Sequence, residues 1–326
     1  MSSSTVLAMA LVSTRGIGST GACLLAQEYE SIADLAEAVN SGGLTGRYSR
    51  WADALRRLAD GADAAQREAE REIARHIDQG IGVVAVSDEA YPRRLRLLAD
   101  APPLLYWLGD LAAASRDSVA IVGTRHPSPV AVEVTRRLSE RFVRAGFCIV
   151  SGLAQGIDTA AHQAALDAGG STVAVVGTPL DRVFPASNAA LQQRIIDAGG
   201  CVLSELPLGH AGHPSDFAKR DRIQSGLSLG VVPIQTSRTG GTMHTVRYAV
   251  KQERLLVCPR PVASDGRADY GGVLEAIETM DCVVLEDAAD YEGTFRRLSM
   301  TAAALDADGS TTAASLDEHG SGDTLF

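Results

Sequence analysis

Short apolar runs that end in a glycine-bearing or polar turn recur between residues 119 and 260, and each turn opens a helical pattern. The runs are rich in Val and Ile and occupy residues 119–125, 148–158, 172–177, 201–205 and 229–236. Short buried strands that alternate with helices of about 10 to 18 residues predict a parallel sheet with crossover helices. Because ligands of such sheets bind beyond the carboxyl ends of the strands, we expect the functional residues on these turns.

The flanking segments carry different patterns. Residues 8–40 and 50–77 have apolar positions at helical spacing, and the chain after about residue 293 is polar and acidic. We therefore expect three parts, namely a small helical domain at residues 1–80, an α/β domain at residues 81–290 and an acidic, disordered tail at residues 291–326.

A turn at Thr14-Arg-Gly-Ile-Gly18 breaks the first helical pattern. It is similar to the helix-hairpin-helix motif, in which a Gly-x-Gly turn brings backbone N–H groups against a DNA phosphate. The alternative is a plain connection between two helices, in which a glycine supplies the C-cap. The sequence leaves both interpretations open.

The net charge of the chain is −10, which argues against a general nucleic-acid binder. The charge is unevenly distributed, however. Residues 118–260 contain 15 Lys and Arg against 10 Asp and Glu, a local balance of +5, so the remainder of the chain carries −15. The segment with the glycine turns is therefore the basic part of the chain, and its turns suit an anionic ligand.

The five cysteines lie far apart in the sequence, and three of them fall inside predicted buried strands. This distribution is typical of a reduced compartment, without structural disulfides or a zinc site. No apolar run approaches the roughly 18 to 20 residues that cross a bilayer. We expect a cytoplasmic protein that has no membrane partner and needs no metal and no cofactor.

Three of the turns have the composition of a phosphate site. Gly123-Thr-Arg125 puts a permanently charged guanidinium beside backbone N–H groups at the end of a strand, although Arg125 pairing with a nearby carboxylate is the alternative. In the next turn glycine allows close backbone approach, and the helix N-terminus that follows favours negative charge. The residues of this turn and of the third turn are Ser151, Gly152, Gly156, Gly240, Gly241 and Thr242.

Asp158 and His162 stand at i and i+4, on one face of the helix that follows the second turn. Such a pair can hold a metal or act as an acid–base pair, but the sequence offers no third ligand. We therefore expect a hydrogen bond that ties the turn to its helix.

The densest basic cluster is Phe217-Ala-Lys-Arg-Asp-Arg222, at the head of another helix. Lys219, Arg220 and Arg222 suit phosphates, and the Phe217 ring suits stacking on a base of a single strand. The alternative is a solvated helix turn with Phe217 in the core.

The motifs, taken in order, resemble the DprA/Smf family of bacterial DNA-processing proteins. The matching pieces cover roughly residues 80–290, and they are Tyr91-Pro92, Pro103 to Gly109, Ala120 to Arg125, Ser151 to Asp158 with His162, Phe184-Pro185, Leu203 to Glu205, Phe217 to Ser228 and Gly240 to Val246. The resemblance implies an α/β fold with an extended Rossmann-like, doubly wound and mostly parallel sheet, preceded by a small helical domain.

The resemblance also implies a function and a set of site residues. Family members bind single-stranded DNA in a basic pocket without cutting it, form dimers and help load a RecA-type recombinase in natural transformation. Arg125, Lys219, Arg220 and Arg222, with the glycine turns, would line that pocket, and Phe217 would stack on a base.

The chain departs from the family pattern at several positions. Asp221 stands where the family has Asn, Gly240 to Val246 differs from the usual Ser-Gly-Ser-Leu-x-Thr-Ala, and Arg260 replaces the glycine after Pro259. These changes leave room for a divergent role, such as phage defence beside another partner protein.

The rival class is a nucleotide sensor or an enzyme that uses the same pocket. Nucleotide phosphoribohydrolases that are similar to lysine decarboxylases carry Pro-Gly-Gly-x-Gly-Thr-x-x-Glu, and Gly241-Thr242 aligns with the Gly-Thr pair of this motif. Thr245 stands at the position of the glutamate, so acid–base cleavage has no obvious agent. We therefore expect a binding protein without a catalytic residue.

Overall fold

The computed structural model describes residues 1–43, 46–262, 266, 268–287 and 289–317, with side chains as far as Ala307. The N-terminal part is helical and contains α1 (Ser3–Ser13), α2 (Ser19–Glu28), α3 (Ile32–Asn40), η1 (Gly46–Trp51), α4 (Ala52–Asp60) and α5 (Ala62–Ile77). The strands are β1 (Gly82–Ala85), β2 (Leu104–Gly109), β3 (Ser118–Val122), β4 (Cys148–Ser151), β5 (Thr172–Val175), β6 (Cys201–Ser204), β7 (Gly230–Pro233), β8 (Leu255–Pro259) and β9 (Val283–Leu285).

Helices connect most of these strands. They are α6 (Arg93–Arg96), η2 (Leu111–Ser115), α7 (Pro129–Arg144), α8 (Ile157–Asp167), η3 (Ala186–Asn188), α9 (Ala189–Asp197), α10 (Pro214–Leu227), α11 (Thr242–Lys251) and α12 (Gly271–Thr279), and α13 (Asp290–Asp317) follows β9. Each strand-turn-helix unit between β3 and α11 begins at one of the apolar runs of the sequence, so the predicted alternation of strands and helices is confirmed.

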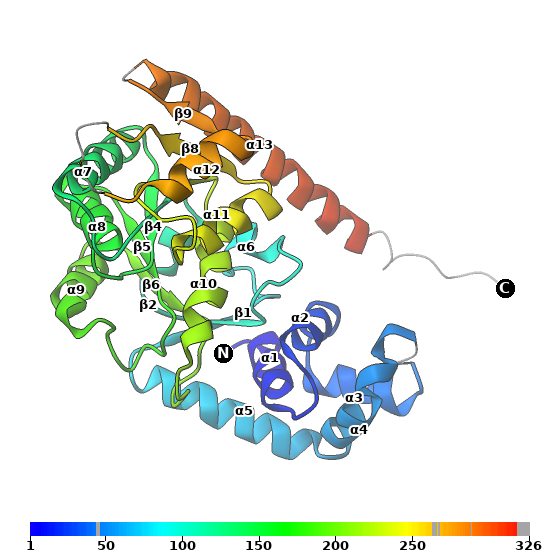
Figure 1. Cartoon of the computed structure of the whole chain (residues 1–326). Helices are drawn as coiled ribbons and strands as arrows, with labels where there is room; N and C mark the ends of the chain where they lie inside the picture. Colours follow the sequence, from blue (N-terminus) through cyan, green and yellow to red (C-terminus); the bar gives the residue numbers. More distant parts are fainter. Residues whose placement is uncertain (44–45, 263–265, 267, 288, 318–326) are drawn as a thin grey trace.

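The strands form one sheet in the order β1-β2-β6-β5-β4-β3-β7-β8-β9 (Figure 1). The pairs from β6 across to β9 are parallel, and β1 and β2 add an antiparallel edge. The predicted mostly parallel α/β fold is therefore confirmed. The chain builds outward from β3 to β6 on one side of the sheet and then returns to place β7 on the other side of β3, so the direction of winding reverses between β3 and β7.

Both faces of the sheet are buried, which explains the continuous apolar runs in the sequence. Val119 and Ile121 of β3 point to one face, where they share a core cluster with residues of α7, α8 and α13. Ala120 and Val122 point to the opposite face and belong to a cluster that includes residues of α10, α11 and α12. Successive strand residues alternate between the faces, so each strand must supply apolar side chains at every position.

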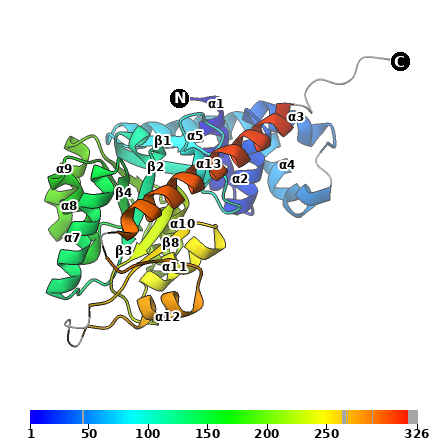
Figure 2. The ribbon, with the colours of Figure 1, turned by 90° about the horizontal axis from the view of Figure 1, so that it is seen from above.

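The helical N-terminal part packs directly on the antiparallel edge of the sheet. Figures 1 and 2 show α1 and α5 beside β1 and β2. Tyr106 of β2 is buried and stacks on the ring of His76 of α5 with 4.6 Å between the ring centroids. The His76 Nε2 atom accepts a hydrogen bond of 3.0 Å from the backbone N–H of Leu208, which lies just before α10. The secondary structure changes near residue 80, as expected, but one hydrophobic cluster includes residues from both sides of that boundary.

The glycine turn near the N-terminus connects α1 to α2. Gly16 has a φ of +100°, which favours glycine, and Gly18 caps the N-terminus of α2 without a side-chain hydrogen bond. The backbone carbonyl of Arg15 accepts a hydrogen bond of 3.1 Å from Arg57 of α4. This geometry fits a plain connection as well as a phosphate-binding hairpin.

The prediction of a disordered tail is wrong for residues 290–317, because this segment forms α13. Phe295, Leu298 and Ala302 pack against the cluster on the α7 face, and Leu298 is fully buried. These residues recur at helical spacing, so the first half of the segment has an apolar stripe despite its acidic composition. The helix then runs toward α6, where the Arg93 side chain donates a hydrogen bond of 2.6 Å to the carbonyl of Asp306. The last nine residues of the expected tail, 318–326, lie outside the described part of the chain.

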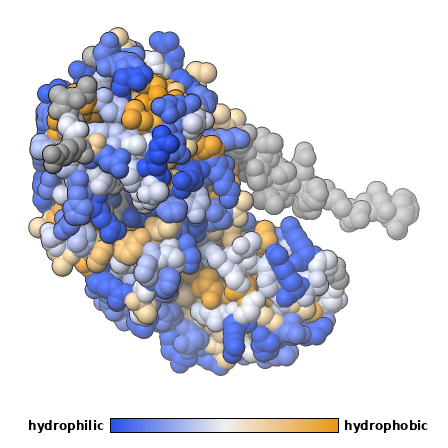
Figure 3. All heavy atoms as spheres, viewed as in Figure 1, coloured by the Kyte–Doolittle hydropathy of each residue, from blue (hydrophilic) through white to orange (hydrophobic). Residues whose placement is uncertain are grey.

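The surface is mostly hydrophilic on the face drawn in Figure 3, and apolar residues reach it in small separate groups. No helix in the described ranges is long and apolar enough to span a membrane. The five cysteines, all within those ranges, are free thiols, as expected, and those at 148, 201 and 258 lie inside strands.

Candidate functional site

A cavity of about 520 Å³ opens where the winding of the sheet reverses between β3 and β7. Its wall combines the turn after β3, the turn after β7, the start of α11 and one face of α10. Binding sites of doubly wound folds lie at this position, because the connections on the two sides diverge and leave a crevice. The volume lies within the range of small-molecule sites.

Two predicted residues stand together at the mouth of the cavity. Arg125 is exposed, and its guanidinium carbon lies 5.8 Å from the centroid of the Phe217 ring. The Phe217 ring in turn lies 5.4 Å from the ring of Phe184, which is 49% exposed. A smaller cavity of about 70 Å³ adjoins this pair and is lined by the same three side chains. The mouth therefore combines a cation with one exposed ring, Phe184, and one half-buried ring, Phe217.

Polar side chains that are buried or nearly buried form the floor of the cavity, which we define as Asp158, Arg220, Asp221 and Gln224. The Arg220 side chain donates a hydrogen bond to the carbonyl of Val175, and its Nε atom lies 3.2 Å from Asp221 Oδ1. Burial raises the pKa of the Asp221 carboxyl to about 6, although Arg220 opposes the rise. Burial also raises the pKa of Asp158, again against the effect of Arg220. The floor thus holds one guanidinium between two carboxyl groups.

Glycines make room for this arrangement. A Cβ atom on Gly152 would lie 2.1 Å from Arg220 Nη1, so the arginine can occupy the floor only because residue 152 has no side chain. Gly156 has a φ of +83° and packs against the carbonyl of Thr124, which a Cβ atom would approach to 2.4 Å. Gly123 packs equally closely on Ile157. The first two turns therefore need glycine for packing as well as for access to a ligand.

The third turn contributes the remaining predicted residues. Gly240, Gly241 and Thr242 all line the cavity at the start of α11, and Gly241 is the N-cap of that helix. The α11 N-cap makes no side-chain hydrogen bond. The backbone N–H groups of Met243 and His244 in the first turn of α11 donate to the carbonyls of Gly240 and Gly241 at 3.0 Å each, so this helix N-terminus attracts an anion mainly through its dipole.

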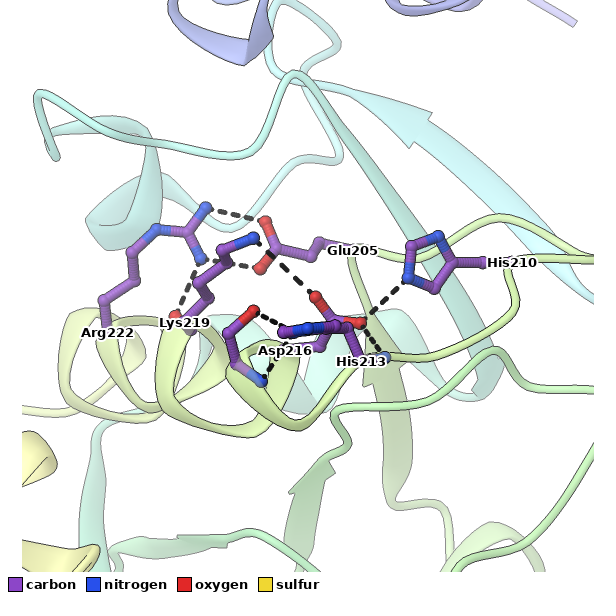
Figure 4. A network of polar contacts seen from close by, with 7 residues as sticks. Glu205, His210, His213, Asp216, Lys219 and Arg222 are labelled. Atoms are coloured by element: carbon purple, nitrogen blue, oxygen red, sulfur yellow. Dashed lines mark hydrogen bonds and ion pairs between the residues drawn. The ribbon is translucent and has the colours of Figure 1, made fainter.

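Two of the predicted basic residues do not line the cavity. Arg222 is buried and forms a two-pronged pair with Glu205, with Nη1–Oε1 and Nη2–Oε2 distances of 2.9 and 2.7 Å (Figure 4). Lys219 is exposed and lies 3.7 Å from Asp216 on the same side of α10. Neither residue lines the cavity, because residues two or three positions apart on a helix point in different directions, and the binding of DNA by exposed Lys219 stays a prediction. Positions 217, 220, 221 and 224 share the face that lines the cavity, and 219 and 222 lie off it.

The Arg222 side of α10 holds the helix in place. His213 is the N-cap of α10 and forms a capping box with Asp216, whose Oδ2 accepts a hydrogen bond of 2.7 Å from the His213 backbone N–H. The same oxygen lies 2.8 Å from His210 Nε2 (Figure 4). Together with the Arg222–Glu205 pair, these contacts fix α10 against the loop after β6. Within the basic cluster, Arg222 therefore positions the helix, and Phe217 and Arg220 line the cavity.

Ser151 also differs from its prediction. Its side chain is fully buried, and its hydroxyl donates a hydrogen bond of 2.7 Å to the carbonyl of Ile121 in β3. It joins two strands and does not line the cavity.

The Asp158 interpretation is confirmed, and His162 has a different role. Asp158 Oδ2 accepts hydrogen bonds from the backbone N–H groups of Gly152 (3.1 Å) and Ala154 (3.3 Å), which ties the turn to α8. His162 Nδ1 lies 2.7 Å from the Thr172 hydroxyl, which itself donates to the carbonyl of Ile149. Burial, together with the charge of Arg220, lowers the pKa of His162 to about 3. His162 is therefore a neutral core residue.

Several cavity residues were not predicted. Gln224 lies on the floor, where its amide oxygen, oriented toward Gly152, accepts from that residue's N–H (2.8 Å) and from Arg220 Nη1 (3.1 Å). The sequence did contain a signal for Gln224, because it follows Phe217 by seven residues, or two helical turns, and therefore lies on the same face of the helix. Others lie on turns that have no such periodicity, among them His126, Ala154, Thr236 and Ser237, whereas Pro214 belongs to α10 and His244 and Thr245 belong to α11.

Comparisons with known proteins match this fold and sequence. The model of the family described as DNA recombination-mediator protein A covers residues 82–290. Protein Smf from Synechocystis sp. is 41% identical over 166 residues, which are 50% of this chain and 42% of that protein. The DNA processing protein DprA from Bacillus subtilis is 34% identical over 185 residues, 56% of this chain and 62% of that protein. The match thus spans about half the length of these curated relatives.

Two solved structures also superimpose on the chain. DNA processing protein A (DprA) from Streptococcus pneumoniae gives a TM-score of 0.69 at 26% identity and covers 90% of this chain and 98% of that one. DNA processing protein A from Helicobacter pylori gives a TM-score of 0.57 at 27% identity and covers 67% and 96%. The family model includes β1 to β9, and with them every element that lines the cavity. The chain therefore belongs to the DNA recombination-mediator protein A family, which is the DprA/Smf family that its motifs resemble.

Proposed function

We propose that the chain binds single-stranded DNA at the mouth of the cavity and does not cut it. The observation that carries the proposal is the pairing of Arg125 with Phe217 at the mouth, 5.8 Å apart, beside the N-terminus of α11. A guanidinium and a helix N-terminus suit the phosphates of the strand, and the partly exposed Phe217 ring can accept any base by stacking. Such a site recognises the backbone and the faces of the bases, so it accepts many sequences.

Family membership supports this proposal. The Helicobacter pylori structure is described as showing a single-stranded DNA binding mode of that protein. The basic balance of residues 118–260 points the same way, because phosphate contacts supply most of the affinity of sequence-independent binding. The carboxyl groups on the floor do not oppose it, since the strand backbone stays at the mouth.

The test is fluorescence anisotropy of a labelled oligo-dT titrated with wild type, Arg125→Ala and a matched control at several salt concentrations. Arg137→Ala is the control, because Arg137 is another exposed arginine, which pairs with Glu133 on α7 and does not line the cavity. We expect Arg125→Ala to weaken binding about tenfold and to reduce the slope of log affinity against log salt by about 0.7. Equal affinity of the two variants would contradict the proposed site.

We further propose that the chain forms a homodimer and helps to load a RecA-type recombinase in the cytoplasm, in natural transformation or in phage defence. The support is family membership. Recombinase-dependent ATP hydrolysis on single-stranded DNA, with and without the chain, tests loading, and analytical ultracentrifugation tests the dimer. An unchanged rate and a monomer at micromolar concentration would contradict these two parts separately.

The alternative function is binding of a free mononucleotide, which the volume of the cavity favours. Unlabelled mononucleotides in the same titration distinguish the two functions. Strong displacement by a mononucleotide, together with affinity that does not depend on strand length, would favour the alternative.

A further inference from the structure

The charges of the cavity are separated by depth. Arg125 is exposed at the mouth, but the side chains of Arg220 and Asp221 are only 8% and 13% exposed, and Asp158 is 6% exposed. One guanidinium and two carboxyl groups face each other on the floor. The mouth is therefore basic, and the floor is neutral to acidic at pH 7.

This separation decides which part of a nucleotide can reach the floor. A phosphate brought beside Asp158 and Asp221 would meet two carboxyl groups where screening by water is weak, and the Arg220 side chain already pairs with Asp221 and donates to the Val175 carbonyl. The phosphate is stabilised instead near Arg125 and the N-terminus of α11. What enters the floor must therefore be an uncharged group that carries hydrogen-bond donors, and in a nucleic acid that group is the edge of a base.

The floor also has a definite hydrogen-bond pattern. The Nε atom of Arg220 is buried and has no hydrogen-bond partner among the described residues, although it lies 3.2 Å from Asp221. Asp221 has two oxygens with about four lone-pair sites, of which the Thr245 hydroxyl uses part, while Arg220 faces Oδ1 as an ion pair. The floor thus presents a donor next to acceptors.

Guanine is the base whose edge complements this pattern. It carries an acceptor (O6) next to two donors (N1–H and the 2-amino group), whereas thymine carries one donor between two acceptors. Cytosine and adenine have an amino donor but no second N–H donor beside it on that edge. Only guanine can satisfy Arg220 and give two hydrogen bonds to Asp221.

We propose that the cavity floor is a base-selective subsite in which Asp221 accepts hydrogen bonds from a guanine edge and Arg220 donates to its O6 atom. The proposal rests on the proposed binding of single-stranded DNA and adds a preference among bases. Asp221 is then a specificity-determining residue, and Arg125 and Phe217 hold the neighbouring backbone and base.

The test is competition against labelled oligo-dT by three mononucleotides, dGMP, dIMP and dTMP, for wild type, Asp221→Asn and a control. Asp197→Asn is the control, because Asp197 is an exposed carboxylate on α9. For wild type we expect dGMP to compete about tenfold better than dTMP, and dIMP, which lacks the 2-amino group, to lose most of this advantage. For Asp221→Asn the ratio of dGMP to dTMP competition, measured relative to that variant's own affinity for oligo-dT, should fall to about one, and Asp197→Asn should keep the wild-type ratio.

The outcomes separate the two proposals. If oligo-dT does not bind wild type, the proposed function fails. If oligo-dT binds but dGMP and dTMP compete equally, or Asp221→Asn keeps the preference, the guanine subsite is overturned and the binding of single-stranded DNA stands. The comparison of dGMP with dIMP needs wild type only, so it decides the question even if Asp221→Asn does not fold.

Discussion

Asp221 is ionised at neutral pH in a position that is almost buried, and replacing it with asparagine should stabilise the protein. Burial raises the pKa of this carboxyl from 3.8 to about 6, with Asp158 adding to the rise and Arg220 opposing it. A rise of this size corresponds to about 3 kcal/mol by which folding disfavours the ionised form. Asparagine has nearly the same shape and carries no charge, so we expect Asp221→Asn to raise the free energy of unfolding at pH 7.5 by up to about 3 kcal/mol.

The sign of the pH dependence follows from the direction of the shift. The folded pKa lies above the unfolded pKa, so the group's contribution is favourable at low pH and is lost as the pH rises from about 4 through 6. Asparagine does not titrate. The stability advantage of Asp221→Asn should therefore shrink to about half, about 1.5 kcal/mol, at pH 5.

The assay is urea unfolding of wild type and Asp221→Asn at pH 7.5 and pH 5, followed by circular dichroism. Asp197→Asn, an exposed carboxylate on α9, serves as the control and should show little change at either pH. If Asp221→Asn is less stable than wild type at pH 7.5, the ion pair with Arg220 outweighs the desolvation of the carboxylate. A gain of the same size at both pH values would show that titration of Asp221 is not its source.

Three further variants test which residues stabilise the fold and which shape the cavity. Arg222→Ala leaves the half-buried Glu205 carboxylate unpaired and should lower the free energy of unfolding by about 3 kcal/mol or more in urea titrations, while folded protein keeps its affinity for oligo-dT. A loss of affinity without a loss of stability would show that Arg222 contacts DNA after all. Gly152→Ala puts a Cβ atom 2.1 Å from Arg220 Nη1 and should displace that arginine, which a reduced preference for dGMP over dTMP in the competition assay would detect. Unaltered competition would mean that Arg220 can move without consequence. Leu298→Ala opens a cavity under α13 and should lower the melting temperature with a loss of about 2 to 5 kcal/mol, whereas no change would indicate that α13 is not docked in solution.

The strands and their turns could be predicted because a parallel sheet with helices on both faces forces each strand to be apolar at every position. Val119 to Val122 shows this directly, with alternate residues in two different core clusters. The cavity residues Arg125 and Gly240 to Thr242 could be predicted as well, because the carboxyl ends of parallel strands meet at one edge of the sheet.

The assignment of the basic cluster to one surface failed for a physical reason. Arg220 and Arg222 are two residues apart on a helix, so their side chains point in different directions. Only the tertiary structure reveals that Arg222 forms an ion pair with Glu205. The hydroxyl of Ser151 likewise donates to the carbonyl of Ile121 in the neighbouring strand, a partner that no local sequence pattern specifies. Composition misled the prediction at α13, where the spacing of Phe295, Leu298 and Ala302 was the better guide.

The shared core beneath β1 and β2 has a consequence for how the protein can be divided. Leu7 of α1, Leu55 of α4 and Val175 of β5 belong to one hydrophobic cluster, although the match to the family model begins only at residue 82. A fragment that starts there would expose the outer side of the antiparallel edge, including Tyr106, to water. If the helical segment is exchanged between relatives, the edge strands β1 and β2 must therefore be exchanged with it. A chimaera should be joined after β2, and not at the boundary near residue 80.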